Sequence, residues 1–291
     1  MNGRLIHTGQ VVLDLVMRVP ELPVPGGDVM ASSMDFLPGG GFNVMAAAAR
    51  AGADVLYAGL HGTGGFADVA RAAMAAEGIA LAHAPSAEGG TGIVVALVQD
   101  DGERTFVTGP GAEGRMPPGL LDAITPTDKD VVYVTGYSLL HETNSRALID
   151  WLPRTGGATV LFDPGPLAGK IPAAELAAVL AQVDILSCSA GEAKTLEEAG
   201  EHVEVLIVRE GPAGCRVVTG GRSVTVPGFP VATVDTNGAG DAHCGVLAAE
   251  VLAGTGLLEA ARRANAAAAI AVTRHGPATS PARAELDAFL R

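Results

Sequence analysis

The sequence has little cysteine, no long apolar run and few basic residues, and each shortage excludes a class of protein. Its three cysteines are odd in number and form no C-x-x-C pair, so they suggest neither a disulfide framework nor a zinc site. No apolar run approaches the roughly 20 residues that span a bilayer, and the first residues lack the order of a signal peptide. We therefore expect a cytoplasmic protein with no membrane partner.

The shortage of basic residues bears on the partners of the chain. It has 19 Lys and Arg against 32 Asp and Glu, which gives a formal net charge of −13, and only three of the bases are lysines. No basic run or basic–aromatic stripe occurs, so nucleic acid is not expected as a partner. Because the overall field repels anions, any anion must be bound locally, by backbone amides, helix ends, a few arginines or a bound cation.

Apolar material is abundant: 48% of the 291 residues are hydrophobic and 18% are charged, enough for a large core. Short β-branched or apolar runs alternate with alanine-rich stretches, which predicts an α/β fold with helices on both faces of a mostly parallel sheet. The predicted strands are Arg4–Leu15, Asp54–Ala58, Thr91–Val98, Thr105–Thr108, Val131–Thr135, Thr159–Asp163, Ile185–Ser187, Val205–Arg209 and Cys215–Thr219. The predicted helices are Asn43–Ala51, Phe66–Glu77, Glu142–Trp151, Ala173–Ala181, Gly191–Ala199, Gly240–Ala253 and Leu257–Thr273.

Two segments, residues of about 10–38 and 91–108, interrupt this alternation. Both have an extended pattern with turn signals, at Pro23–Gly27 and at Asp100–Gly102. We expect them to form a small β-sheet that closes over a ligand as a lid. Without an internal repeat or a low-complexity linker, the chain is expected to form one domain of residues 1–291.

The strongest local signal is Asp235–Asp241, the run DTNGAGD, which leads directly into an apolar helix. Its glycines let the backbone approach a ligand, and the amides of the first helical turn make an anion site at the positive end of the helix dipole. Asp241 would repel an anion bound there. Its presence is explained if it is a general base that takes the proton of a hydroxyl attacking a phosphoryl group. A helix-stabilising charge after a tight turn is the simpler alternative.

A second signal is Pro38–Asn43, the run PGGGFN, which also precedes a helix. Its glycines again allow close approach of the backbone to a ligand, and the amide of Asn43 both donates and accepts hydrogen bonds. A connector with Asn43 as a helix N-cap is equally compatible with this segment alone.

Together the two segments resemble the ribokinase-like (PfkB) carbohydrate and nucleoside kinases, in the right order over nearly the whole chain. The matching positions are Gly39, Gly40, Asn43, Gly52 and Gly62 in the first signature, and Asp235–Asp241 and Gly245 in the second. Met45 and Val246 stand where the family usually has smaller residues. The resemblance implies a three-layer α/β/α sandwich with a β-sheet lid.

The resemblance also implies roles for single residues in phosphoryl transfer to a sugar. Asp241 matches the catalytic base, and Gly238, Ala239 and Gly240 match the anion hole. The residues that match sugar-binding positions are Asp14, near the end of the first strand, and Gly40, Gly41 and Asn43. Arg104 lies on a lid strand and is a weaker candidate for contacting the ligand.

The nucleotide side departs from the family pattern at two positions. The usual Asn-x-x-Glu element has Ser189 in place of Asn and keeps Glu192, which the family uses to organise magnesium and phosphate. The next element has Arg209 in place of Thr, and an arginine there could pair with a nucleotide phosphate. The other nucleotide-side positions implied by the resemblance are Gly211, Gly214 and Asn265, the last in the adenine pocket.

The resemblance further implies ATP and Mg²⁺ as cofactors, with Glu192 reaching Mg²⁺ through water. A K⁺ site is implied at Asp235, Asn237, Gly276 and Ser280. Because the Gly39–Asn43 segment carries no charge, we expect the acceptor to be an unphosphorylated sugar or polyol.

Two alternatives stay open at this stage. One is a nucleoside kinase of the same family, with Phe36, Phe42 and Phe106 lining a slot for the base. The other is a sensor that binds sugar or nucleotide without turnover. A homodimer through the lid is expected from the exposed sheet edge that the lid predicts.

Overall fold

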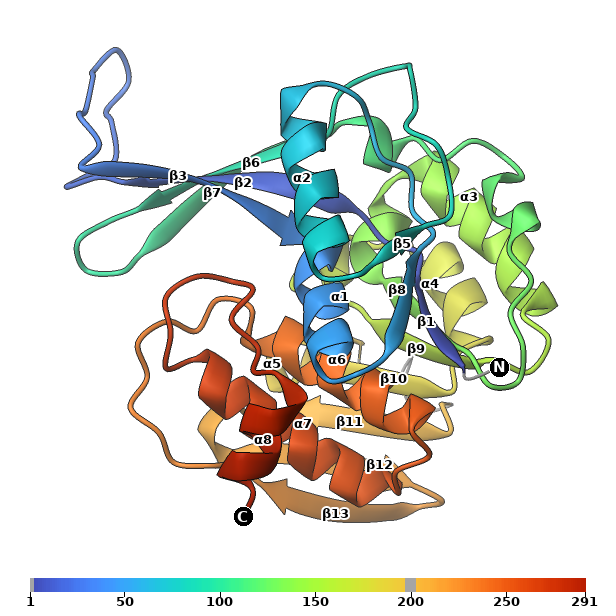
Figure 1. Cartoon of the computed structure of the whole chain (residues 1–291). Helices are drawn as coiled ribbons and strands as arrows, with labels where there is room; N and C mark the ends of the chain where they lie inside the picture. Colours follow the sequence, from blue (N-terminus) through green and yellow to red (C-terminus); the bar gives the residue numbers. More distant parts are fainter. Residues whose placement is uncertain (1–2, 197–202) are drawn as a thin grey trace.

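The computed structural model describes residues 3–196 and 203–291 (Figure 1). Its main sheet has the strand order β13-β12-β11-β10-β9-β8-β1-β4-β5. Strand β12 pairs antiparallel with both of its neighbours, β11 and β13, and all other neighbouring strands are parallel. The strands of this sheet are β1 (Arg4–His7), β4 (Asp54–Tyr57), β5 (Ala80–Leu81), β8 (Val131–Thr135), β9 (Thr159–Asp163), β10 (Ile185–Ser189), β11 (Val205–Arg209), β12 (Gly214–Thr219) and β13 (Arg222–Pro227).

Helices cover both faces of this sheet, as the sequence predicts. The helices are α1 (Gly41–Arg50), α2 (Gly65–Ala76), α3 (Glu142–Trp151), α4 (Ala173–Leu180), α5 (Ala190–Leu196), α6 (Ala239–Leu252), α7 (Leu257–Ala271) and α8 (Arg283–Phe289). Shorter 3-10 turns are Ala112–Gly114, Leu120–Ala123, Gly136–Leu140, Leu152–Arg154, Ala168–Lys170 and Gly211–Ala213. The end of the predicted helix Gly191–Ala199 lies outside the described residues.

Alternation along the buried strands divides the core into two layers. Leu5, Val131 and Tyr133 point to the layer packed by α1, α6 and α7. Ile6 and Val132, one residue out of phase, point to the layer packed by α3 and α4. Because a strand places successive side chains on opposite faces, strands that are apolar throughout fill both layers. The predicted three-layer arrangement is confirmed.

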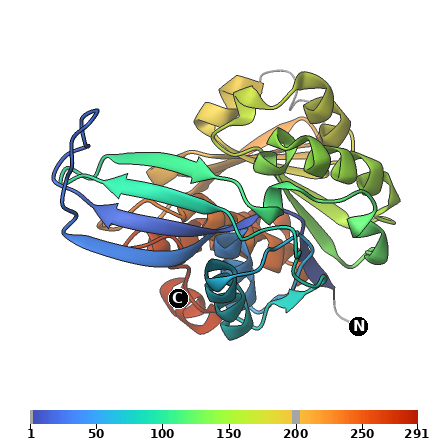
Figure 2. The same cartoon turned by 90° about the horizontal axis from the view of Figure 1, so that it is seen from above.

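A second sheet forms the lid, and Figure 2 shows it extending to one side of the body. Its order is β3-β2-β6-β7, with strands β2 (Val11–Arg18), β3 (Ser33–Gly40), β6 (Ile93–Val98) and β7 (Arg104–Gly109). The turn predicted at Asp100–Gly102 joins β6 to β7, which pair antiparallel. The lid thus comes from the two extended segments that the sequence analysis singled out.

The prediction of one strand over Arg4–Leu15 is wrong. The segment divides into β1 of the main sheet and β2 of the lid. The division falls at Gly9, where an added Cβ atom would lie 2.5 Å from Cγ2 of Thr135. A glycine is needed there because the chain crosses close to β8. Asp14 therefore lies in the lid and not at the end of the first strand.

No helix in the described residues is long and apolar enough to cross a membrane. That finding agrees with the absence of long apolar runs noted in the sequence.

Candidate active site

The DTNGAGD run folds as a tight turn that starts α6. Gly238 is the N-cap with a φ of 75°, a conformation that favours glycine. A Cβ atom at this position would lie 1.8 Å from the carbonyl oxygen of Pro277, so only glycine fits against that backbone. The first-turn amides that follow lack intrahelical acceptors by the geometry of a helix start, which suits them to bind an anion.

Asp241 lies in the first turn of α6 and faces α1. Its Oδ2 accepts a hydrogen bond of 3.0 Å from Nδ2 of Asn43, a residue of α1. The two helices approach closely because Gly245 has no side chain: a Cβ there would lie 2.3 Å from the carbonyl oxygen of Val44. The two signatures of the sequence are thus brought into direct contact through one carboxylate.

Burial raises the pKa of Asp241 to about 6, even though the hydrogen bond from Asn43 favours the charged form. Among the described residues, Oδ1 of Asn43 is buried without a hydrogen-bond partner. A carboxylate with a pKa near neutrality can take up a proton during a reaction. An adjacent unpaired acceptor is suited to bind a hydroxyl group.

Asp14 lies on β2 of the lid, in the same neighbourhood. Burial raises the pKa of Asp14 to about 6, and repulsion from Asp241 adds to this rise. A Cβ at Gly39, on the neighbouring strand, would lie 2.3 Å from Oδ2 of Asp14, so the glycine makes room for the carboxylate.

The other two glycines of the PGGGFN run shape the junction of lid and body. Gly40 has a φ of 60°, and the amide of Gly41 donates to the carbonyl of Gln10 at 2.7 Å. Gly41 is already the first residue of α1. This turn places Asn43 in the first helical turn, opposite Asp241.

Arg104, at the start of lid strand β7, forms an ion pair with Oδ1 of Asp235. That carboxylate also accepts hydrogen bonds from the amides of Asn237, at 2.8 Å, and Gly276, at 3.1 Å. Burial alone would raise the pKa of Asp235, but these hydrogen bonds and the charge of Arg104 outweigh it and hold the pKa below its usual value. The ion pair joins the lid to the loop before α6.

Three of the four residues predicted to bind K⁺ lie together, since the amides of Asn237 and Gly276 both donate to the carboxylate of Asp235. The fourth, Ser280, is buried, and its Oγ has no hydrogen-bond partner in the described residues. A buried hydroxyl without a hydrogen-bond partner is suited to bind a cation. Asp235 is less suited, because its carboxylate is already paired with Arg104.

Ser189 and Glu192 meet at the junction of β10 and α5. The amide of Ser189 donates to Oε2 of Glu192 at 2.7 Å, and the amide of Glu192 donates to Oγ of Ser189 at 3.2 Å. This reciprocal capping fixes the Glu192 carboxylate at the helix start. Ser189 thus orients Glu192.

Arg209 lies in the interior, at the end of β11. It forms ion pairs with Asp163 at 3.0 Å and with Glu192 at 3.4 Å, and it donates to Oγ of Ser187 at 2.8 Å. Asp163 was missed by the sequence analysis. Its signal was the position at the carboxyl end of a parallel strand, where ligand sites of α/β sheets lie.

The remaining nucleotide-side residues make backbone contacts. Nδ2 of Asn265, on α7, donates to the carbonyls of Val226 at 3.0 Å and Pro227 at 3.2 Å. Gly214 has a φ of 99°, and a Cβ there would lie 2.2 Å from the carbonyl oxygen of Val226. Gly211 begins the short turn before it. These residues hold the start of β12 against the end of β13 and the face of α7.

The predicted aromatic slot is wrong for two of its three residues. Phe36 stacks on Phe66 with ring centroids 5.7 Å apart. Leu37 pairs with Asp14 and shares its face of the lid, so Phe36, the preceding residue, points to the opposite face. Phe42 is buried in the main core. Phe106 alone is exposed on the face that carries Asp14.

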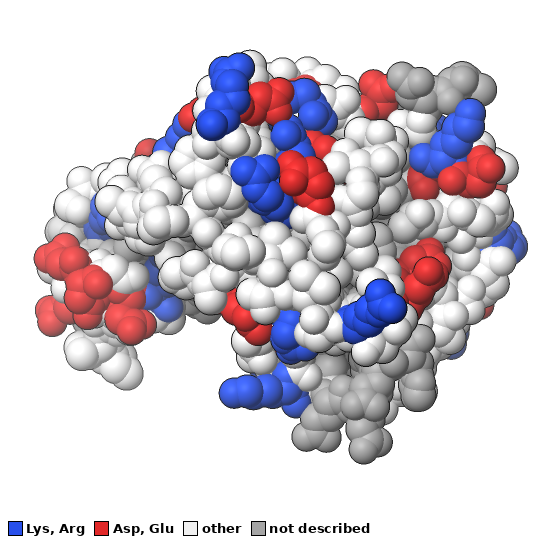
Figure 3. All heavy atoms as spheres, turned by 90° about the horizontal axis from the view of Figure 1, so that it is seen from below, with Lys and Arg blue, Asp and Glu red and all other residues white. Residues whose placement is uncertain are grey.

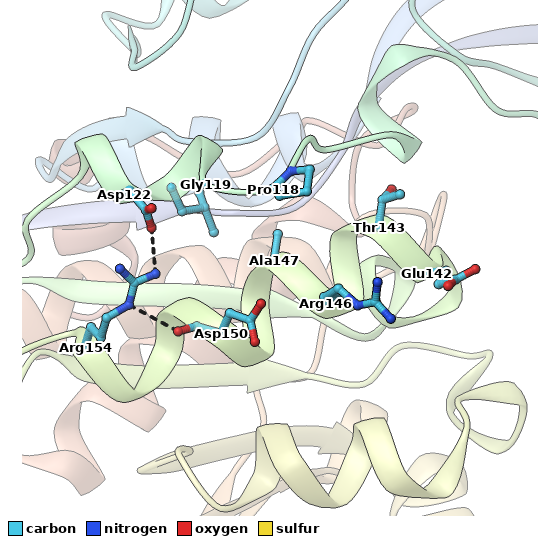
Figure 4. Close-up of a pocket in the computed structure, with 10 residues that line it drawn as sticks. Pro118, Gly119, Asp122, Glu142, Thr143, Arg146, Ala147, Asp150 and Arg154 are labelled. Atoms are coloured by element: carbon cyan, nitrogen blue, oxygen red, sulfur yellow. Dashed lines mark hydrogen bonds and ion pairs between the residues drawn. The ribbon is translucent and has the colours of Figure 1, made fainter.

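A separate cleft of about 170 Å³ lies between the first turns of α3 and the segment before β8 (Figure 4). Arg154 spans it, donating to Asp122 at 2.6 Å and to the carbonyl of Asp150 at 3.2 Å. None of the predicted site residues lines this cleft. The candidate active site is instead the group around Asp241.

Surface charge agrees with local anion binding. Figure 3 shows charged side chains scattered over the lower face, with acidic ones gathered toward the end of the lid. The exposed turn between β6 and β7 carries Asp100, Asp101 and Glu103. Anions are therefore attracted by specific groups within the site, since the surrounding surface does not supply a broad positive field.

A partly buried carboxylate beside the amides of a helix start, with a second carboxylate on a β-sheet lid, is the arrangement expected of a phosphotransferase that acts on an alcohol group. The model of the pfkB family of carbohydrate kinases matches residues 3–284, and the chain belongs to this family. It is an ATP-dependent sugar kinase of that family.

Relatives match over almost their full length. An uncharacterised sugar kinase of Escherichia coli, YegV, is 31% identical, with 98% of each chain covered. An ATP-dependent ribose-1-phosphate kinase of Halopiger xanaduensis is 32% identical, with 99% of this chain and 98% of the relative covered. The ribokinase structure from Thermotoga maritima has a TM-score of 0.81 at 24% identity, with 99% of both chains covered. This last likeness bears on the fold alone.

Proposed function

We propose that this chain transfers the γ-phosphoryl group of ATP to a hydroxyl of a small unphosphorylated sugar or sugar-like polyol, with Asp241 as general base. The observation that carries the proposal is the position of Asp241: a partly buried carboxylate, held by Asn43, in the first turn of the helix that offers an anion site. A charge that repels the bound phosphates is best explained by a role in taking up a proton.

The reaction follows from these groups. The acceptor hydroxyl gives its proton to Asp241 while its oxygen attacks the γ-phosphorus in line. The bond from the γ-phosphorus to the bridging oxygen breaks, and ADP leaves with that electron pair. The backbone at Gly238, Ala239 and Gly240 stabilises the charge on the phosphoryl oxygens. The lid, which carries Asp14, excludes water that would otherwise compete as acceptor.

Magnesium bound with ATP neutralises charge on the phosphates. The carboxylates of Asp163 and Glu192 are hard oxygen donors of the kind that Mg²⁺ prefers, so the residues present fit this ion. The described residues hold no group of three or more candidate metal-ligating side chains. As the family resemblance implies, Glu192 would reach such an ion through water.

An uncharged polyol suits the acceptor side. Asp14 offers two carboxylate oxygens and Asn43 an unpaired amide oxygen, and both accept hydrogen bonds from hydroxyl groups. The nearest lid arginine identified in the site, Arg104, is paired with Asp235. An acceptor that already carried a phosphate group would bring it close to these carboxylates, which repel it.

A nucleoside acceptor is the second candidate, favoured by a single observation. Phe106 is exposed on the lid face that carries Asp14, where a flat base could stack. Without Phe36 and Phe42 in the same place, the slot is reduced to one ring. We therefore rank sugars and polyols first.

The test of this function is ADP release from Mg-ATP with a panel of unphosphorylated sugars, sugar acids, polyols and nucleosides. We expect one acceptor class to raise ADP release far above the rate without acceptor, and the phosphorylated product to appear in equal amount. ATP binding by calorimetry without turnover on any acceptor, including ribose-1-phosphate, would contradict the kinase and leave a sensor.

Potassium gives a separate prediction, based on the orphaned hydroxyl of Ser280. We expect K⁺ to raise kcat relative to tetramethylammonium at the same ionic strength, and Ser280→Ala to remove the difference. Thr255→Ala is the control. It removes a hydroxyl that donates to Glu250 and not to the predicted cation site, so the K⁺ response should be kept. Equal rates in both salts would show that the Arg104–Asp235 ion pair replaces the cation.

Two further expectations stay predictions. A homodimer through the lid is supported by the exposed apolar side chains of Met34 and Val107 on the lid face opposite to Asp14. The cytoplasmic location expected from the sequence is the other.

A further inference from the structure

The two departures of the nucleotide side from the family pattern lie opposite each other. Strands β10 and β11 pair in parallel, and the register places Ser189 beside Arg209. Both residues contact the same atom, because Oε2 of Glu192 accepts from the amide of Ser189 at 2.7 Å and from Nη2 of Arg209 at 3.4 Å. The two departures therefore form one local unit and call for one explanation.

Arg209 is held by more contacts than a surface ion pair has. Its Nη1 donates to Oδ2 of Asp163 at 3.0 Å, to Oγ of Ser187 at 2.8 Å and to Sγ of Cys244 at 3.0 Å. Its side chain is only 14% exposed. Cys244 belongs to α6, so the guanidinium touches the helix that carries Asp241. Contacts of this number fix its position.

The balance of charge explains why a cation is needed there. Asp163 and Glu192 are two nearly buried carboxylates next to a site that must bind a triphosphate. Unpaired, they would repel it strongly, since the screening by water is weak inside a protein. Although burial acts to lower the pKa of Arg209, Asp163 and Glu192 hold it well above its ordinary value, so the arginine stays charged.

The guanidinium also lies beside the anion hole itself. A Cβ atom built on Gly240 would lie 3.8 Å from Nη2 of Arg209 and 3.9 Å from its Cζ. Gly240 is the second residue of α6. The positive charge of Arg209 is thus added, from the protein side, to the positive end of the helix dipole.

We propose that Arg209 is a positioning residue: its buried guanidinium neutralises Asp163 and Glu192, holds Glu192 toward the nucleotide and adds a fixed positive charge beside the anion hole, with Ser189 as its matched neighbour. This inference rests on the proposed kinase function, and it states that this function depends on the positive charge of Arg209. It differs from a direct contact to phosphate, because the arginine stays in its ion pairs throughout turnover.

The same charge acts on Asp241, whose surroundings are mostly acidic or neutral. The Arg209 guanidinium lowers the pKa of Asp241, whereas the Asp163 carboxylate raises it. The titratable or charged groups around Asp241 are Asp14 from β2, Tyr133 from β8, Tyr137 after β8, Asp163 from β9 and Arg209 from β11. Removing Arg209 therefore shifts the acidic limb of the rate profile to higher pH.

The experiment compares Arg209→Thr with the double variant Ser189→Asn/Arg209→Thr, which restores both usual family residues. We expect the single variant to lower kcat by about 10- to 100-fold, the loss typical of a buried charged hydrogen bond. Because asparagine and threonine carry no positive charge, we expect the double variant to stay about as slow as the single one. Arg216→Met, which removes a half-exposed arginine paired with Glu210 just after β11, is the matched control and should keep the wild-type rate.

Arg209→Lys is the second variant, suited to a case in which Arg209→Thr does not fold. It keeps the charge, so the acidic limb should stay in place. A single ammonium cannot hold both carboxylates, so calorimetry should show weaker binding of a non-hydrolysable Mg-ATP analogue. Analogue binding equal to that of the wild type would overturn the role assigned to the guanidinium.

Wild-type turnover separates this inference from the proposed function. If the wild type releases no ADP with any acceptor, the kinase proposal fails first. If the wild type is active and Arg209→Thr keeps its kcat and its acidic limb, the inference fails alone. A double variant with the wild-type kcat would show that the positive charge is not needed, and would likewise overturn the inference.

Discussion

Asp241→Asn should lower kcat by about 10²- to 10⁴-fold, the usual contribution of a general base. Binding of acceptor and of ATP should change little, because asparagine has the same shape and its carbonyl can still accept the hydrogen bond from Asn43. Only the capacity to take up a proton is lost. ADP release measures turnover, and calorimetry on the same preparation measures both affinities.

The wild-type pH profile provides an independent check on this role. Because burial raises the pKa of Asp241 to about 6, kcat should fall as the pH drops through that value and the base becomes protonated. The residual activity of Asp241→Asn should lack this limb. Asp122→Asn, which breaks an exposed ion pair with Arg154, should behave as the wild type. Unchanged turnover in Asp241→Asn would show that Asp241 is not the general base.

The main sheet could be predicted because its signals are local. The strands Val131–Thr135, Thr159–Asp163 and Val205–Arg209 are short apolar runs, and the structure has them with the predicted bounds. Helix Glu142–Trp151 was likewise predicted to the residue. Each of these elements is set by its own pattern of side chains and by the residues that end it.

The division of Arg4–Leu15 could not be predicted in this way. Both halves are β-branched and apolar, and only the pairing partners distinguish them: β1 pairs with β4 and β8, and β2 with β3 and β6. The edge strand β13 was missed for a related reason, since its pairing with β12 decides its conformation. Long-range pairing is not contained in a local pattern.

The candidate site shows the same limit. The family resemblance implied that Asn43 binds the acceptor and that Asp241 is the base, and the structure has the two side chains in contact. The surroundings of Arg209 were not foreseen, because they join Asp163, Ser187 and Cys244 from three separate elements. A residue type alone does not tell which strand ends lie next to one another.

Gly238→Ala should disable the enzyme through backbone geometry alone. The φ of 75° strains any other residue, by about 1–2 kcal/mol, and the new Cβ would overlap the carbonyl oxygen of Pro277, from which it would be 1.8 Å away. The turn must therefore move, and the amides at the start of α6 move with it. We expect a loss of about 10²-fold in kcat, as when an oxyanion donor is removed.

Gly254→Ala, at the other end of α6, separates strain from the loss of the anion hole. Gly254 has a φ of 74°, and a Cβ there meets nothing within 4 Å. The Gly254→Ala substitution should lower the free energy of unfolding by about 1–2 kcal/mol and leave kcat unchanged. This backbone strain is common to both variants. Denaturant unfolding and ADP release on both variants make the comparison. If Gly238→Ala folded with the stability of Gly254→Ala and kept the wild-type kcat, the turn at Gly238 would have no part in holding the transferred phosphoryl group.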